Sequence, residues 1–455
     1  MTDVTHQDDS SATATVASEA IVHDRAPGRE TAQTPSSEKT AAGALRVAYL
    51  ASKFPFPSQT FVLNEVEAHH REGVEILPLS CDRQGDESLL SNTGRKWARQ
   101  TVTPGSLVNR FWCVVRECFR SPIGTIRNVC WLIALLFVDP IEFLKGVKEF
   151  FAAASLARAV RQADVQLIHV HFASRSLNAG IMLSHLTGVP VSCTIHAFEL
   201  WFRSGRNLRF RLKNCLFIAT ESEYHVRYIR EKCGEKIGAL CHVIHNGVDI
   251  SQFDADRHDP VSGRIVLISR LAEKKGHKYL IEACSILKER QVECECVIVG
   301  GGEDYDTLAK QIKELGVGQS VRLVGPAAND QLRRYLDSAA VLALPAIVAS
   351  DGDQDGIPLA LVEAMACGVP VVSTNVAGIP ELLRDGEAGC IVPQRDSQAL
   401  ADALESLLAD EDRQRQLSVE GRKMVEAEFD IIKSAVKLRT RFGAAIAEDK
   451  AKRSK

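Results

Sequence analysis

The sequence of 455 residues lacks a long apolar run. Its longest, VCWLIALLFV at residues 129–138, is about half of the roughly 20 residues that a membrane-spanning helix needs. No apolar segment follows the first methionine, and residues 1–44 are instead rich in Ser, Thr, Ala and charged side chains. We therefore expect neither a secretory signal nor a spanning helix, and we expect residues 1–44 to form a disordered tail.

An excess of positive charge is also missing, since the formal net charge is -3. A chain of this charge has no general attraction for nucleic acid, so we expect no nucleic-acid partner. Any binding of an anion has to come from local clusters of Arg and Lys.

The 13 cysteines lack the spacing of a zinc site. Their one tight pair, Cys294 and Cys296, has no second pair to complete a metal-binding set. The others are scattered through apparent strands and helices, which is typical of reduced thiols in a cytoplasmic enzyme. The sequence predicts no metal, no disulfide framework and no cofactor.

Short runs of β-branched and apolar residues alternate with helical segments through the rest of the chain. The first series is LRVAYLAS, VEILPLS, VQLIHVHF and VPVSCTIHAF, and the second is RIVLISR, ECECVIVG, VRLVG, AVLALP, PVVST and GCIVP. This alternation predicts an α/β fold with two doubly wound, parallel-sheet domains. We expect them at residues 45–250, with a helical insertion at 107–160, and at 251–430, followed by a helix and basic tail at 431–455.

The strongest motif joins Asp355, Gly356, Ile357 and Pro358 to Glu363. Ligands of open parallel sheets bind beyond the carboxyl ends of strands, where this motif lies. Pro358 favours the start of a helix whose free N–H groups attract an anion or a hydroxyl-rich ligand, and Gly356 lets the backbone approach closely. The two carboxylates are at most about 12 Å apart along a helix, so one can meet a sugar and the other a ribose. Each carboxylate taken alone also fits a solvated helix residue.

A second motif, SRLAEKKG, directly follows the strand RIVLI. Its Arg270 and Lys275 can neutralise a diphosphate leaving group without a metal, and Gly276 permits a tight turn. Considered alone, the motif also fits a solvated cationic loop.

A glycine-rich turn follows the strand ECECVIVG and includes Gly301 and Gly302. Such a turn can lie against a nucleotide, but the G-x-G-x-x-G pattern of dinucleotide-dependent oxidoreductases is missing. Without further support, a plain structural turn is the alternative.

Two further motifs belong to the first domain. His196 ends a strand within TIHAFE, three residues before Glu199, and a lone histidine at such a place is either structural or catalytic. The loop FPFPSQTF contains Ser58, Gln59 and Thr60, and the hydroxyls of the Ser and the Thr suit a helix cap. We expect His169 and His171, in the preceding strand, to be core residues.

Together these motifs resemble the retaining glycosyltransferases of family 4, which have the GT-B fold of two Rossmann-like domains facing a central cleft. The resemblance covers about residues 45–439. It departs from the family pattern at Asp355 and Gln59, where Glu is usual, and at Glu199, where Asp is common.

The resemblance implies a role for each matching position. Four residues are expected to be catalytic: His196, Arg270, Lys275 and Asp355. The expected donor-binding residues are Arg270, Lys275, Gly301, Gly302, Asp355, Gly356, Ile357, Pro358 and Glu363. The acceptor side is expected to include Ser58, Gln59, Thr60 and Glu199.

The expected activity is transfer of a sugar from a nucleotide diphosphate sugar to a glycan or polyprenol-linked acceptor in surface polysaccharide synthesis. Two alternatives stay open. One is a nucleotide-sugar epimerase of the same fold, and the other is a catalytically idle protein of polysaccharide assembly.

The insertion at residues 107–160 interleaves cations with large apolar side chains such as Trp112, Trp131, Leu135 and Phe137. This mixture suits an apolar face in the headgroup zone of a membrane. We hypothesise a cytoplasmic protein with a peripheral contact at the inner face of the cytoplasmic membrane. The alternative is that these side chains simply pack the insertion onto the first domain.

Overall fold

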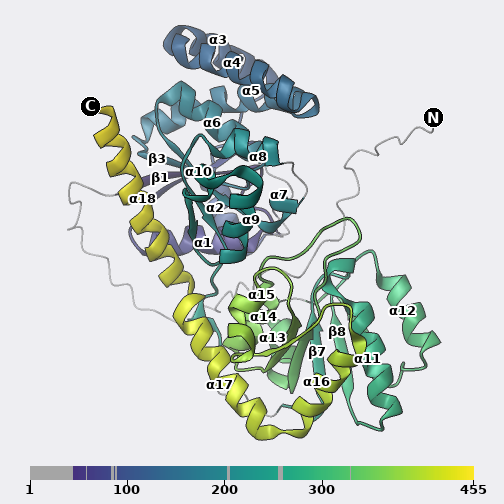
Figure 1. Cartoon of the computed structure of the whole chain (residues 1–455). Helices are drawn as coiled ribbons and strands as arrows, with labels where there is room; N and C mark the ends of the chain where they lie inside the picture. Colours follow the sequence, from purple (N-terminus) through teal and green to yellow (C-terminus); the bar gives the residue numbers. More distant parts are fainter. Residues whose placement is uncertain are drawn as a thin grey trace, which may run out of the picture.

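The computed structural model describes residues 45–454 except 58, 83–86, 88–89, 202–204, 255–259 and 328. The predicted tail at residues 1–44 and the candidate Ser58 therefore lie outside the described residues. Figure 1 shows two lobes, with the chain ending in a long helix that runs from the second lobe back to the first.

The N-terminal domain is built on a parallel sheet in the order β2-β1-β3-β4-β5-β6. Its strands are β1 (Arg46–Ala51), β2 (Glu75–Ser80), β3 (Leu167–His171), β4 (Val191–Ile195), β5 (Cys215–Thr220) and β6 (Cys241–Val243). Around the sheet lie α1 (Thr60–Arg71), α2 (Asn92–Gln100), α6 (Arg175–Thr187), α7 (Ala197–Trp201), α8 (Gly205–Leu212), α9 (Glu223–Cys233) and α10 (Glu235–Gly238).

The C-terminal domain has a second parallel sheet, in the order β12-β11-β10-β7-β8-β9. Its strands are β7 (Arg264–Ile268), β8 (Glu295–Val299), β9 (Val321–Gly325), β10 (Val341–Leu344), β11 (Val371–Thr374) and β12 (Cys390–Val392). Its helices are α11 (His277–Glu289), α12 (Tyr305–Glu314), α13 (Asn329–Ser338), α14 (Leu359–Ala366), α15 (Ile379–Leu382), α16 (Ser397–Ala409) and α17 (Glu411–Glu428). The predicted α/β fold with two parallel sheets is confirmed.

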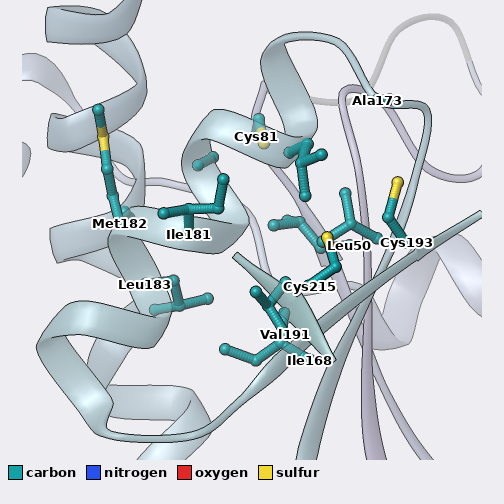
Figure 2. Close-up of a cluster of buried hydrophobic side chains, with 14 of the residues drawn as sticks. Leu50, Cys81, Ile168, Ala173, Ile181, Met182, Leu183, Val191, Cys193 and Cys215 are labelled. Carbon is teal, nitrogen blue, oxygen red and sulfur yellow. The ribbon is translucent and has the colours of Figure 1, made fainter. Parts of the chain in front are cut away.

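Each sheet is covered by apolar side chains on both faces, as the runs of Val, Ile and Leu in its strands require. Figure 2 shows part of the N-terminal core, where Ile181 and Leu183 of α6 lie against Ile168 and Val191 of the strands. Because the strands are parallel, their carboxyl ends open at one edge of each sheet, and the loops that follow them carry the candidate site.

The chain crosses back between the domains near residue 430. The N–H of Val248 donates to the carbonyl of Phe429, and the N–H of Ile431 donates to the carbonyl of Val248. The C-terminal helix α18 (Ile431–Arg453) then packs Leu438 and Phe442 into the apolar core beneath β1. The last helix of the sequence thus completes the first domain.

The insertion forms three helices, α3 (Leu107–Arg120), α4 (Pro122–Val138) and α5 (Pro140–Gln162). No single helix among the described residues is long and apolar enough to cross a bilayer; α3 and α4 pass such a test only together, and they are bent by 118°. Trp131 and Leu135, which we placed in a membrane-facing surface, are buried instead, while Phe137 is 80% exposed. Trp131 stacks on Phe210 of α8, so part of the insertion packs as core.

Candidate functional site

The loop after β7 and the glycine turn after β8 lie against each other. The N–H of Leu271 donates to the carbonyl of Gly301 at 2.9 Å. A Cβ at Gly300 would collide with the carbonyl oxygen of Ser269, and one at Gly302 with that of Leu271. The glycines are therefore needed for this close approach, which brings Arg270 beside the turn.

Lys275 is held against Asp355 at the end of this loop. Its Nζ lies 2.7 Å from a carboxylate oxygen of Asp355, and Lys274 lies 3.4 Å from the other oxygen. Lys274 also pairs with Asp353 at 3.0 Å. Burial alone would raise the pKa of Asp355, but Lys275 and Lys274 outweigh it and keep that pKa below its ordinary value. Two separate sequence motifs thus form one charged cluster.

Arg270 differs from these lysines. Within the described part of the chain, its half-buried guanidinium has no ion-pair partner. An anion at this strand end would therefore meet a cation that is free to pair with it.

Helix α14 begins directly beyond Pro358, so its first N–H groups face the same loop region. Glu363 lies on this helix and is only 6% exposed. A Cβ added at Gly356 would come within 2.6 Å of His225 and 2.7 Å of Glu221 in the N-terminal domain. The Asp355 loop is therefore at the contact between the two domains.

On the N-terminal side, His196 follows β4 and is contacted by residues of α7 and α1. Its backbone N–H donates to the carboxylate of Glu199 at 3.0 Å. The ring of Phe61, on α1, lies 4.8 Å from the His196 ring, centre to centre. Gln59 is the N-cap residue of α1, which begins at Thr60, but its side chain makes no capping hydrogen bond. The predicted acceptor-side loop thus approaches His196 through Phe61.

A buried chain of hydrogen bonds leads from His196 into the domain. Nε2 of His196 lies 3.3 Å from Nδ1 of His171, and Nε2 of His171 lies 3.1 Å from the Glu65 carboxylate. The Tyr49 hydroxyl donates to the same carboxylate oxygen at 2.9 Å. Burial alone would raise the pKa of Glu65, but the nearby histidines, above all His171, hold that pKa well below its ordinary value.

These contacts couple the protons of His196 to those of His171. The ionised Glu65 can only accept, so Nε2 of His171 donates to it. A neutral His171 accepts the N–H of His196 at Nδ1, whereas a protonated His171 donates from Nδ1 to Nε2 of His196. Burial lowers the pKa of His196 to about 3, and His171 adds to this shift, so the ring is neutral above that pH.

Glu65 and His171 were not among the predicted site residues. We expected His171 to be a core residue, and it is indeed buried, but it also contacts His196. Among the described residues, one His, Cys, Asp or Glu group has metal-like spacing, Glu65 with His169 and His171. Both ring nitrogens of His169 are already hydrogen-bonded to Ser192 and Thr194, at 2.9 Å each, so this group fits a hydrogen-bond network better than a metal site.

Comparison with known proteins gives two family matches. Residues 252–424 match the model described as Glycosyl transferases group 1, and residues 118–252 match that of Glycosyltransferase Family 4. The amylovoran biosynthesis glycosyltransferase AmsK of Erwinia amylovora is 34% identical over 420 residues, which cover 85% of this chain and 96% of AmsK. A putative colanic acid biosynthesis glycosyltransferase of Escherichia coli K12, WcaL, is 28% identical over 404 residues, with the same two shares.

Solved structures agree with the fold. HepE of Anabaena, in complex with UDP, superposes with a TM-score of 0.65 at 17% identity, covering 88% of this chain and 100% of that one. Sucrose-phosphate synthase of Thermosynechococcus elongatus gives a TM-score of 0.65 at 18% identity, covering 89% and 100%. Likeness at this identity concerns the fold, and it matches the two-domain architecture expected from the sequence.

Proposed function

Because the chain belongs to the group 1, family 4 glycosyltransferases and has their GT-B fold, we propose that it transfers a sugar from a nucleotide diphosphate sugar with retention of configuration. The observation that carries the proposal is the cluster in which Arg270 lies beside the glycine turn and Lys275 pairs with the partly buried Asp355. The acceptor is a glycan or a polyprenol-linked glycan of a surface polysaccharide. Polysaccharide synthesis is the process named for AmsK and WcaL.

The donor diphosphate binds at the cationic strand end. Arg270 and Lys275 neutralise the phosphate charge that grows as the sugar leaves, and the turn at Gly301 and Gly302 leaves room for the nucleotide. The guanidinium group of Arg270 and the ammonium group of Lys275 supply the positive charge for this step, so we propose that a metal is not required. HepE, which has the same fold, binds UDP.

The transferred sugar lies between the two domains. Asp355, Gly356 and the first N–H groups of α14 hold its hydroxyls, and Glu363 accepts hydrogen bonds from the ribose. The acceptor hydroxyl attacks on the face from which the diphosphate leaves, and the donor phosphate takes its proton. His196 shapes the reacting centre.

The two carboxylates are expected to have separable effects. Glu363→Gln should weaken donor binding roughly 10- to 150-fold, because a hydrogen bond to a charged group contributes about 1.5–3 kcal/mol. Asp355→Asn should instead lower turnover by a similar factor, since it misplaces the sugar and frees Lys275. Steady-state kinetics over a donor concentration series separates KM from kcat. If neither constant changed in folded variants, the assignment of this pair would be wrong.

We also propose that Glu65 and His171 position His196. Glu65→Gln removes the ionised acceptor that orients His171, so kcat should fall about tenfold while the donor KM stays near that of the parent. The matched control is Glu67→Gln on the same helix, where the carboxylate accepts a hydrogen bond from Trp97. Equal losses of kcat in both variants would mean that the chain of hydrogen bonds is structural only.

A lipid-linked acceptor is anchored in a membrane, so the enzyme has to bind at the membrane surface to reach it. We propose that the α3–α5 layer makes this peripheral contact, while the cytoplasmic location expected from the sequence stays a prediction. The epimerase and the idle assembly protein are the competing functions, and no contact in the site favours either of them.

A further inference from the structure

The helices α3, α4 and the start of α5 expose an apolar face. Most of the large apolar side chains exposed by the described residues lie on this layer, and Leu107, Phe119, Phe137 and Leu144 are each 72–84% exposed. In Figure 1 the layer lies at the outer end of the N-terminal domain, away from the C-terminal domain. Soluble monomers rarely expose so continuous a patch unless it meets a partner or a membrane.

Cations border this face along α3. At 3.6 residues per turn, Leu107, Phe111 and Phe119 lie on one side of the helix. Around the helix, Arg116 and Arg120 lie next to this apolar side, in the direction of α5. An apolar face with arginines at its margin has the charge distribution that suits a headgroup zone.

The margin contains a cavity of about 320 Å³. It is lined by Arg116 and Arg120 of α3 and by Arg158, Arg161 and Gln162 of α5. Four guanidinium groups around one hollow repel each other unless an anion lies between them. Their planar N–H groups match the oxygens of a phosphate.

One carboxylate compensates part of this charge. Glu117 is fully buried and accepts hydrogen bonds from Arg161 at 3.1 and 2.6 Å, and it lies 3.5 Å from Arg116. Over the described ranges, Arg120 and Arg158 have no carboxylate within ion-pair distance. Glu117 thus fixes the inner wall of the cavity, and the two exposed arginines keep their charge for a ligand.

The cavity is remote from the reacting groups. It lies at the carboxyl end of α5, just before β3 begins, whereas His171 and His196 lie at the opposite ends of their strands. Arg161 also donates to the carbonyl of Leu186 at the end of α6, on the same side. The ligand is therefore not the acceptor at the catalytic centre.

We propose that this cavity binds the phosphate of an anionic phospholipid headgroup while the apolar face enters the same leaflet. The inference rests on the membrane contact proposed above and gives it a specific headgroup site. The arginine-lined cavity and the apolar face lie in the same helical layer. A phospholipid has both a phosphate for the cavity and acyl chains for the apolar face, whereas a free phosphate has only the first.

The test is flotation with vesicles of phosphatidylcholine, with and without phosphatidylglycerol. The parent should float with the anionic vesicles and be partly released by high salt. Arg120→Gln combined with Arg158→Gln should lower the partition coefficient roughly 30-fold, since each cation near an anionic surface contributes about a factor of five. Arg415→Gln with Lys423→Gln removes the same charge from an exposed face of α17 and should float like the parent.

Apolar-face variants separate the two parts of the proposal. Phe119→Ser with Phe137→Ser should lose flotation, whereas Val419→Ser on α17 should not. If the arginine pair and its charge-matched control float equally, the headgroup site is wrong even though membrane contact stands. If the parent fails to float, or if inorganic phosphate stabilises it against heat without any preference for anionic vesicles, the phospholipid assignment is overturned.

Calorimetric binding of UDP and GDP distinguishes this failure from failure of the proposed function. The double arginine variant should bind whichever nucleotide the parent binds, with unchanged affinity. Loss of nucleotide binding in that variant would contradict a site remote from the donor.

Discussion

Replacing Arg270 or Lys275 with Ala is expected to weaken the binding of a nucleoside diphosphate roughly 10- to 150-fold in each variant. Each side chain supplies a charge-assisted contact of about 1.5–3 kcal/mol to the phosphates. The effects should differ in origin. Arg270 has no ion-pair partner among the described residues, so its loss removes phosphate binding alone, whereas loss of Lys275 also deprives the partly buried Asp355 of its 2.7 Å partner.

Calorimetry with UDP and GDP measures these losses without knowledge of the sugar. Lys278→Ala is the matched control, because Lys278 is exposed on the neighbouring helix α11, where it lies near Glu282. The control should bind like the parent. Unchanged affinity in folded Arg270→Ala and Lys275→Ala variants would contradict the placement of the donor.

The second large expected effect is loss of stability in mild acid. Burial lowers the pKa of His69 to about 4 and that of His196, His225 and His277 to about 3, against an ordinary value of 6.5. Below pH 6.5 the unfolded chain takes up protons that the folded protein cannot, so stability is complete above that pH and falls as the pH is lowered. Each histidine contributes a slope of about 1.4 kcal/mol per pH unit, and several together rival a typical stability of about 5–15 kcal/mol.

Urea unfolding between pH 8 and pH 5 tests this slope. Below pH 6.5, His69→Leu should reduce the slope by up to about 1.4 kcal/mol per pH unit, since this buried ring has no hydrogen-bond partner for either nitrogen in the described structure. A pH-independent stability in the parent would show that the histidines do not titrate on unfolding.

Local patterns predict much of this molecule because parallel strands have a strong local signature. Runs such as RIVLI and ECVIV are apolar after their first residue, and such runs form the buried strands β7 and β8. Since the carboxyl ends of parallel strands meet at one edge of a sheet, the same reasoning places Arg270, Lys275 and the glycine turn together. It also places Asp355 at this edge, although residues 275 and 355 are far apart in sequence.

The remainder depends on contacts that no local pattern encodes. The Glu65 carboxylate is hydrogen-bonded to His171, which is 106 residues away in the sequence. This contact forms only when α1 packs on the sheet, so the sequence alone does not reveal the role of Glu65. Helix α4 is apolar on nearly every side, so its composition cannot tell which face is buried. Contacts with α5, α6 and α8 decide this, placing Trp131 and Leu135 inside and leaving Ile133 and Phe137 exposed.

The central claim is sugar transfer from a nucleotide diphosphate donor, and mass spectrometry of reactions with a panel of nucleotide sugars and a lipid-linked glycan fraction tests it most directly. We expect that one donor is consumed, that the nucleoside diphosphate is released in step with a gain of one sugar on the acceptor, and that Lys275→Ala abolishes both. Isomerised donor formed without any acceptor, or a parent protein that consumes no nucleotide sugar, would contradict it.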